Sequence, residues 1–138
     1  MASPRWCIVR AMGREKGRLR ALGDALARDL DGNVLPFWAR VTVDEEHGGF
    51  LGLLSEDGVP EPQAPKGGVL CARILWSYSA AFCRSGDPAH RRMADRAFGE
   101  LTGRFWDTEH GGTYWMLDGR GRPLSDRKQT YALAFSLY

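Results

Sequence analysis

A stripe of polar side chains interrupts the most apolar segment of the sequence. Residues 66–82 are apolar on almost every face, as in a helix that is buried on most sides. Lys66, Arg73 and Ser77 are seven and four residues apart, so a helix would place them on one face. A buried guanidinium needs acceptors, which either the oxygens of a bound sugar or a carboxylate on a neighbouring helix would supply. The spacing alone leaves both roles open for Arg73.

A second stripe of the same kind lies near the end of the sequence. Lys128, Tyr131 and Phe135 share one face of another apolar segment, and Tyr131 would present a phenol near Arg73 across the mouth of a cavity. The alternative is an aromatic ring packed between helices, with its hydroxyl in solvent. Arg73 and Tyr131 are therefore the two candidate binding residues.

Two histidines flanked by acids raise the question of a metal site. His47 and His110 each precede a Gly-Gly pair, but their spacing matches no known ligand motif, so we expect no metal. Asp44 and Asp107 are better explained as caps of loop backbone, with the glycines at positive φ. The acids of these loops also permit a second interpretation, the carboxylate pair of a glycosidase, because the sequence does not determine their separation.

An internal repeat organises the sequence. The segment Asp44-Glu-Glu-His-Gly-Gly-Phe50 recurs as Asp107-Thr-Glu-His-Gly-Gly-Thr113. Further special residues match at nearly the same offset: Gly58 with Gly121, Pro60 with Pro123, Lys66 with Lys128, Ala72 with Ala134, and Trp76 with Tyr138. The repeating unit is therefore roughly 62 residues long. Each unit contains a Gly-Gly loop, with a short β piece, followed by an apolar helix.

One amphipathic helix is predicted between the two Gly-Gly loops, and a similar one before the first loop. Residues 87–105 begin with an Asp-Pro start signal and carry an apolar stripe made by Ala94, Ala97, Phe98, Leu101 and Phe105. Residues 18–38 carry a similar leucine stripe, with a bend or break expected at Gly32. Outer amphipathic helices that alternate with inner apolar ones predict an all-α toroid of helical hairpins. Because the sequence stops inside an apolar helical pattern, we expect a truncated toroid.

The distribution of charge and the cysteines limit the possible binding partners and the expected compartment. Residues 1–16 form a basic segment that we expect to be a disordered extension rather than a targeting peptide, with the toroid in residues 17–138. The rest of the chain is acidic overall, which excludes a nucleic-acid surface, and no segment is long and apolar enough to span a membrane. Cys7, Cys71 and Cys83 are expected to be reduced, buried thiols of a cytoplasmic protein.

Several motifs together closely resemble the cellobiose 2-epimerase branch of the N-acylglucosamine 2-epimerase superfamily. The resemblance covers nearly everything after residue 17. The motifs that carry it are Leu35-Pro-Phe-Trp38, Asp44 through His47-Gly-Gly-Phe50-Leu-Gly52, Lys66-Gly67, Val69-Leu-Cys-Ala-Arg-Ile-Leu-Trp-Ser-Tyr-Ser79, Phe105-Trp-Asp107, Gly111-Gly-Thr-Tyr-Trp115 and Lys128-x-x-Tyr131-x-x-Ala134-Phe135.

The resemblance implies a fold and a reaction. The fold is an (α/α)6 barrel, of which this sequence would hold about four of twelve helices. The reaction is cofactor-free epimerisation at C2 of the reducing-end glucose of a β-1,4-disaccharide, through ring opening and an enediolate, with two histidines moving the proton. Those histidines belong to later helices in the family, so no catalytic residue is expected here and the fragment alone should be inactive.

The resemblance also assigns the candidate residues. Arg73 is similar to the arginine that contacts the reacting sugar, and Tyr131 to a tyrosine that lines the same pocket. Cys71 departs from the family, since many relatives have asparagine there. Alternatives that stay open are mannose isomerase or N-acylglucosamine 2-epimerase activity on a monosaccharide, a glycoside hydrolase on the same toroid, and a non-catalytic remnant. The oligomeric state is not predicted.

Overall fold

The structure is a computed structural model that describes residues 4–138, with backbone alone for residues 4–14. It divides into two compact units, one ending at Arg40 and the other running from Val41 to Tyr138.

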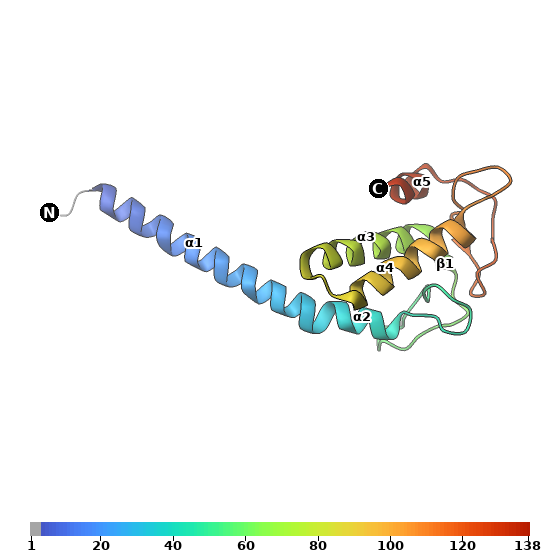
Figure 1. Cartoon of the computed structure of the whole chain (residues 1–138), viewed down its shortest axis with the longest axis horizontal. Helices are drawn as coiled ribbons and strands as arrows, with labels where there is room; N and C mark the ends of the chain where they lie inside the picture. Colours follow the sequence, from blue (N-terminus) through green and yellow to red (C-terminus); the bar gives the residue numbers. More distant parts are fainter. Residues whose placement is uncertain (1–3) are drawn as a thin grey trace. The chain divides into compact units, whose positions relative to one another are not determined.

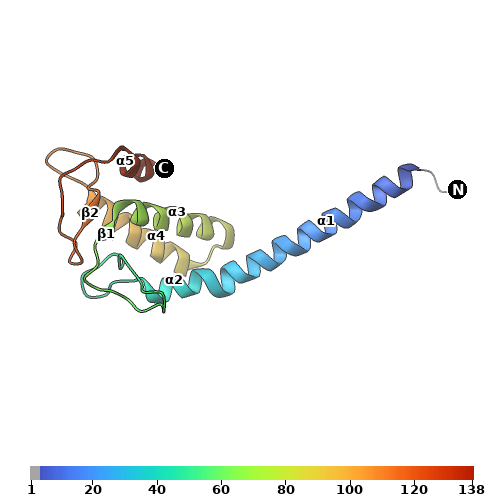
Figure 2. The ribbon, with the colours of Figure 1, turned by 180° about the vertical axis from the view of Figure 1, so that it is seen from behind.

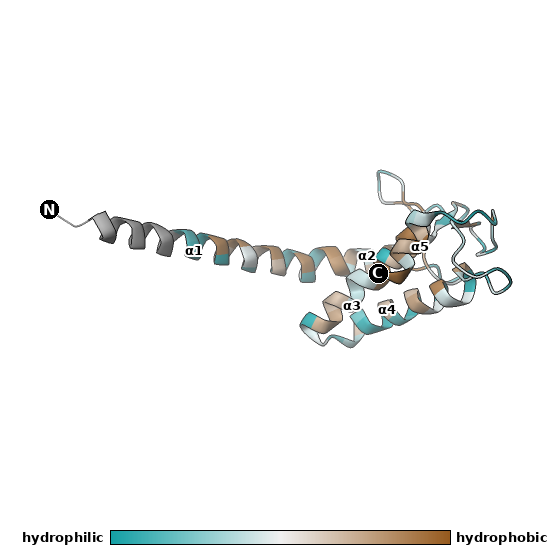
Figure 3. Ribbon diagram, turned by 90° about the horizontal axis from the view of Figure 1, so that it is seen from above, coloured by the Kyte–Doolittle hydropathy of each residue, from teal (hydrophilic) through white to brown (hydrophobic). Residues whose placement is uncertain are grey.

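The first unit is helical throughout its described part. Helix α1 (Pro4–Asp29) continues into a π-helical turn, η1 (Leu30–Val34), and then into α2 (Leu35–Val41). Gly32 lies in η1, so the interruption predicted there is present as a change of helix type. Hydrophobic and hydrophilic residues alternate along the coloured part of α1 in Figure 3, and the leucines of the predicted stripe are exposed: Leu19, Leu22, Leu26 and Leu30. A separate extension over residues 1–16 stays a prediction, and the backbone of residues 4–16 belongs to α1.

A helical hairpin forms the centre of the second unit. Helices α3 (Gly68–Ser85) and α4 (Pro88–Glu100) lie side by side in both Figure 1 and Figure 2, and a π-helical turn, η2 (Leu101–Phe105), follows α4. The turn between them is set by Gly86, which has φ 69° and donates its N–H to Phe82 O, and by Asp87, whose side chain accepts from Ala89 N at 2.8 Å. The predicted start of α4 at Asp87-Pro88 is thus confirmed.

Short β pieces and a last helix complete this unit. Strand β1 (Lys66–Gly67) pairs antiparallel with β2 (Met116–Leu117), and α5 (Thr130–Leu137) packs against α3. The core is made where α3, α4, η2 and α5 meet, and its most buried members are Ala97, Phe105, Leu117 and Ala132.

The internal repeat is visible in the backbone of the two Gly-Gly loops. The isolated bridge Val43↔Phe50 recurs as Trp106↔Thr113, and Leu54↔Pro60 recurs as Leu117↔Pro123. Gly48 and Gly49 have positive φ, as have their counterparts Gly111 and Gly112. The predicted β pieces in these loops are therefore confirmed, and the repeated residues build the same turn twice.

Three expectations about burial need correction. Phe98 was placed on the buried stripe of α4 but is 58% exposed; it lies about 100° around the helix from Ala97, the most buried residue of α4. Leu70 on α3 is also exposed, because α4 and α5 cover only part of that helix. Cys83 is exposed, Cys71 is buried as expected, and Cys7 lies outside the described side chains. No helix in the described part of the chain has the length and apolar content to cross a bilayer.

Candidate functional site: an aromatic groove and two aspartate–lysine loops

A groove of about 270 Å³ opens between α3 and α5. It is lined by Ala72, Arg73, Trp76, Ser77, Phe135 and Tyr138, and we call this set the groove. The aromatic rings of Trp76 and Tyr138 stack with centroids 6.0 Å apart and an interplanar angle of 22°. Aromatic surface combined with a guanidinium and a hydroxyl offers a small polar ligand both ring faces and hydrogen-bonding groups.

Arg73 is an exposed residue in the groove, not the buried arginine that the sequence pattern predicted. Its guanidinium carbon lies 5.6 Å from the centre of the Phe135 ring, which is a cation–π distance. Within the described part of the chain no carboxylate forms a salt bridge with Arg73. The alternative role for Arg73, an ion pair with a carboxylate on a neighbouring helix, therefore finds no support there. The guanidinium donors are left available to a ligand.

Tyr131 lies beside the groove and does not line it. Its ring centre is 4.9 Å from that of Phe135, and its side chain is exposed. Phe135 therefore stands between Arg73 and Tyr131 and contacts both of them. The structure brings the two candidate binding residues to one surface, on α3 and α5, and a role for them in binding stays a prediction.

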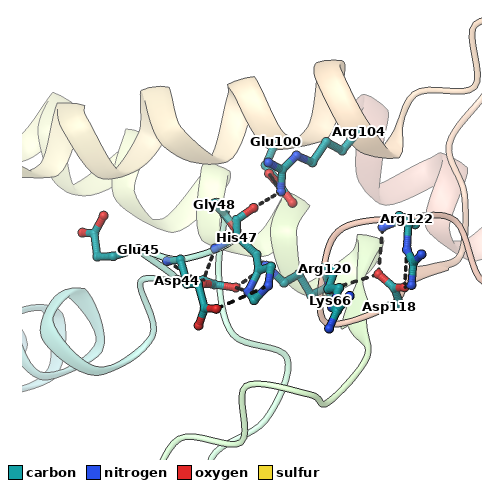
Figure 4. Close-up of polar contacts among 12 residues, drawn as sticks. Asp44, Glu45, His47, Gly48, Lys66, Glu100, Arg104, Asp118, Arg120 and Arg122 are labelled. Carbon is teal, nitrogen blue, oxygen red and sulfur yellow. Dashed lines mark hydrogen bonds and ion pairs between the residues drawn. The ribbon is translucent and has the colours of Figure 1, made fainter.

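Lys66 has a different position from the one that its spacing predicted. It lies in β1, before α3 begins, and its ammonium binds Asp44 Oδ2 at 2.6 Å and Gly48 O at 2.7 Å (Figure 4). Asp44 Oδ1 in turn accepts from the backbone N–H of Glu46 and of His47. The side chain of Lys66 is therefore buried in the loop Asp44–Phe50, which we call loop 1, and it is not part of the groove.

The second repeat builds the same interaction. Lys128 binds Asp107 Oδ2 at 2.6 Å, and Asp107 Oδ1 accepts from the N–H of Glu109 and of His110. We call Asp107–Thr113 loop 2. The Lys128 ammonium and the His110 N–H lower the pKa of Asp107. Burial raises the pKa of Asp44, but the His47 N–H and Lys66 outweigh it, and the net pKa is lowered.

The comparisons with known proteins identify the family. The model of the N-acylglucosamine 2-epimerase (GlcNAc 2-epimerase) family matches residues 48–138, which include the groove and loop 2. The chain belongs to this family. A curated cellobiose 2-epimerase from Bacteroides fragilis is 43% identical over 117 residues, covering 85% of this chain and 30% of that protein.

Solved structures of the epimerase family have the same fold. The cellobiose 2-epimerase of Spirochaeta thermophila DSM 6192 superposes with a TM-score of 0.83 at 39% identity, covering 88% of this chain and 30% of that one. A D-mannose isomerase is less similar, with a TM-score of 0.64 at 26% identity, over 72% of this chain and 25% of that one. The predicted fold, part of an (α/α)6 toroid with short β pieces, is thus confirmed, and the chain spans about 30% of the length of these epimerases.

The acids and histidines of the two loops are held in place by backbone and lysine. His47 Nδ1 and His110 Nδ1 lie 3.9 and 3.7 Å from the aspartate of their own loop. No group of three or more His, Cys, Asp or Glu side chains in the described part of the chain is arranged to hold a metal ion. Because both aspartates already bind a lysine and two N–H groups, they are poorly placed to serve as the acid and base of a glycosidase.

Part of the groove was not recognised from the sequence. Trp76 and Tyr138 were matched as repeat partners and were given no binding role, yet their stacked rings form one side of the groove. The signal was their equivalence in the repeat, since two aromatic residues at matching positions of adjacent inner helices can meet. Cys71, the position that departs from the family pattern, faces away from the groove, and its thiol donates to Ala97 O on α4.

Proposed function

We propose that this chain supplies the sugar-binding part of a cellobiose 2-epimerase. The observation that carries the proposal is the 43% identity to a cellobiose 2-epimerase over 85% of the chain, together with the family match over residues 48–138, which include the groove. The reaction would convert the reducing-end glucose of a β-1,4-disaccharide into mannose by moving the C2 proton. Residues 17–138 would supply the barrel hairpins, and residues 1–16 would precede them. A cytoplasmic location stays a prediction, as does the absence of a cofactor.

The side chains of the groove suit the binding half of this chemistry. Arg73 would donate hydrogen bonds to the carbonyl and hydroxyl oxygens at C1 and C2, where negative charge develops in an enediolate. Trp76 and Tyr138 would offer ring faces to the sugar, and Tyr131 a phenol at the rim. None of the three histidines, His47, His90 and His110, lines the groove. The chain therefore offers no acid/base pair at C2, and we expect no turnover from residues 1–138 alone.

Ligand binding tests the groove independently of turnover. Saturation-transfer NMR with cellobiose should give signal from the sugar in the presence of the 138-residue chain, and Arg73→Ala should weaken binding about tenfold, because charged hydrogen bonds are lost. Arg91→Ala is the matched control, since Arg91 is exposed on α4 and its contacts are with Asp95 and the Phe82 ring, away from the groove. Equal loss in both variants, or no binding by the parent chain, would count against the proposal.

Turnover separates the reaction classes. The continuous reading frame that contains this sequence should be expressed and incubated with cellobiose while the anomeric protons are followed by NMR. A mannose-type reducing end supports epimerisation, whereas free glucose indicates hydrolysis. Mannose supplied alone tests the second candidate, an aldose–ketose isomerase, which the likeness to D-mannose isomerase favours and which would form fructose.

A further inference from the structure

A buried carboxylate on α4 faces loop 1 with one of its oxygens unpaired. Glu100 is 7% exposed, and its carboxylate lies so close to Gly49 that a Cβ at Gly49 would collide with it (Figure 4). Arg104 Nη1 lies 3.7 Å from Glu100 Oε2, which is an ion-pair distance and too long for a hydrogen bond. Glu100 Oε1 has no hydrogen-bond partner among the described residues. A carboxylate oxygen buried in this way requires a donor, because its desolvation is otherwise not compensated.

A small cavity lies beside this carboxylate. It has a volume of about 10 Å³ and is lined by Glu100, Lys66 and Cys71 together with apolar residues that include Phe50 and Phe105. This is roughly the volume that a single water molecule needs, and it is far too small for a sugar. The cavity shares no lining residue with the groove. Because two of its lining side chains carry opposite charges, it differs from the apolar cavities that stay dry in proteins.

Lys66 has one N–H donor more than its protein partners use. Its ammonium carries three N–H bonds, and two of them donate to Asp44 Oδ2 at 2.6 Å and Gly48 O at 2.7 Å. Lys66 is 3% exposed, so bulk solvent does not reach the third. The Cys71 thiol donates to Ala97 O, which leaves its sulfur as a weak acceptor. The cavity is therefore lined by a residue with an unused donor and a residue with an unused acceptor.

We propose that this cavity is a binding site for one water molecule, which donates to Glu100 Oε1 and accepts from the third N–H of Lys66. The Cys71 sulfur is its weak third partner. A water molecule fits the site better than a cation, because a cation could use the carboxylate but would be repelled by the ammonium and could not accept its N–H. The water links the Asp44–Lys66 pair of loop 1 to the Glu100–Arg104 pair of α4 and η2.

Loop 2 has no equivalent of this site. Lys128, the counterpart of Lys66, is 25% exposed, so solvent can accept from its ammonium directly. His110 is likewise 71% exposed, whereas its counterpart His47 is 20% exposed. The bound water is thus expected at loop 1 and not at loop 2.

Counting long-lived waters tests the proposal in solution. ¹⁷O magnetic relaxation dispersion detects water molecules that stay bound for longer than the protein takes to tumble. Glu100→Met keeps the length of the side chain but removes the strong acceptor, so a water would keep Lys66 as its only strong partner. We expect Glu100→Met to contain one long-lived water fewer than the parent 138-residue chain. Glu109→Met is the matched control, because Glu109 is 83% exposed, and its count should equal that of the parent.

A second variant separates water from a cation. Glu100→Gln removes the charge but keeps an acceptor oxygen of the same reach, so the long-lived water should remain. A crystal structure of the parent chain, at a resolution that shows ordered water, locates the molecule without any variant. One peak within hydrogen-bond distance of both Glu100 Oε1 and Lys66 Nζ is the expected result.

Three results would overturn the proposal. An equal count of long-lived waters in the parent chain and in folded Glu100→Met would mean that no such water depends on Glu100. Loss of the water from Glu100→Gln would show that charge and not an acceptor holds the occupant. A crystal structure with an empty cavity, or with an ion surrounded by several oxygens in it, would exclude the water directly, even if Glu100→Met failed to fold.

Discussion

Loop 1 and loop 2 have one backbone design in two environments. In each loop an aspartate binds a lysine that lies roughly 20 residues further along the chain and accepts two N–H groups, while two glycines at positive φ close the turn. Loop 1 is additionally covered by α4 and η2, which hold its carbonyls, and loop 2 is not. The comparison indicates that local interactions are sufficient to shape the loop, and that tertiary cover determines how buried its ion pair is.

The largest expected effect comes from removing the two lysines in turn. Lys66→Met leaves the buried Asp44 carboxylate without its cation and should lower the free energy of unfolding by about 3 kcal/mol or more. Lys128→Met should cost less, because the Lys128 side chain is 25% exposed and water can replace its contact with Asp107. Urea unfolding followed by circular dichroism measures both. Equal losses would show that the cover by α4 does not influence the strength of the pair.

Glycine substitutions distinguish backbone strain within a loop from steric contact with the helix that covers it. Gly49 and Gly112 have similar φ of 66° and 75°, so alanine should strain both positions by about 1 kcal/mol. At Gly49 the new Cβ also meets the Glu100 carboxylate, whereas at Gly112 it meets Leu133, a side chain that can move, at 3.0 Å. We expect Gly49→Ala to cost about 1–2 kcal/mol more than Gly112→Ala in the same unfolding experiment. The reverse order would mean that the second loop is the more tightly packed.

Acid should weaken both loops. In the unfolded chain each aspartate titrates near 3.8, and in the folded chain the pKa values of Asp44 and Asp107 are lower. Below about pH 4 the unfolded state therefore binds more protons than the folded state, so this contribution is present above pH 4 and is lost as the pH falls through the folded pKa values. Unfolding midpoints between pH 7 and pH 3 should decrease, and Asp44→Asn and Asp107→Asn should each flatten the decrease. If the unfolding midpoint depended on pH equally strongly in both variants and in the parent chain, the acid sensitivity would not come from these two aspartates.

The sequence was most informative where residue types are chemically special. Asp and Gly recur at one offset and Lys at nearly the same offset, and this recurrence predicted both loops, the hairpin order and the toroid, because few other residues can replace Asp and Gly in a tight turn. Predictions that depend on helix rotation or on where a helix begins were less accurate. Phe98 is a single residue away from the buried face, and Lys66 was placed on a helix that begins only at Gly68. The groove required α5 to be set against α3, and no local pattern contains that information.

The rate of cysteine alkylation is the prediction with the smallest effect on the structure. It measures directly how well α4 covers the residues beneath it. Burial, reinforced by the nearby Glu100 carboxylate, raises the pKa of Cys71 to about 12, although Lys66 opposes this effect. At pH 8 the thiolate fraction of Cys71 is then on the order of 10⁻⁴, so alkylation should be slower than at the exposed Cys83 by at least a factor of about 10³. Peptide mapping by mass spectrometry separates the two sites. Because Cys71 lies under α4 and donates to Ala97 O, loosening α4 with Arg104→Ala should speed alkylation at Cys71 and leave Cys83 unchanged. Fast labelling of Cys71 in the parent chain would show instead that α4 opens readily, and that the cover distinguishing loop 1 from loop 2 is transient.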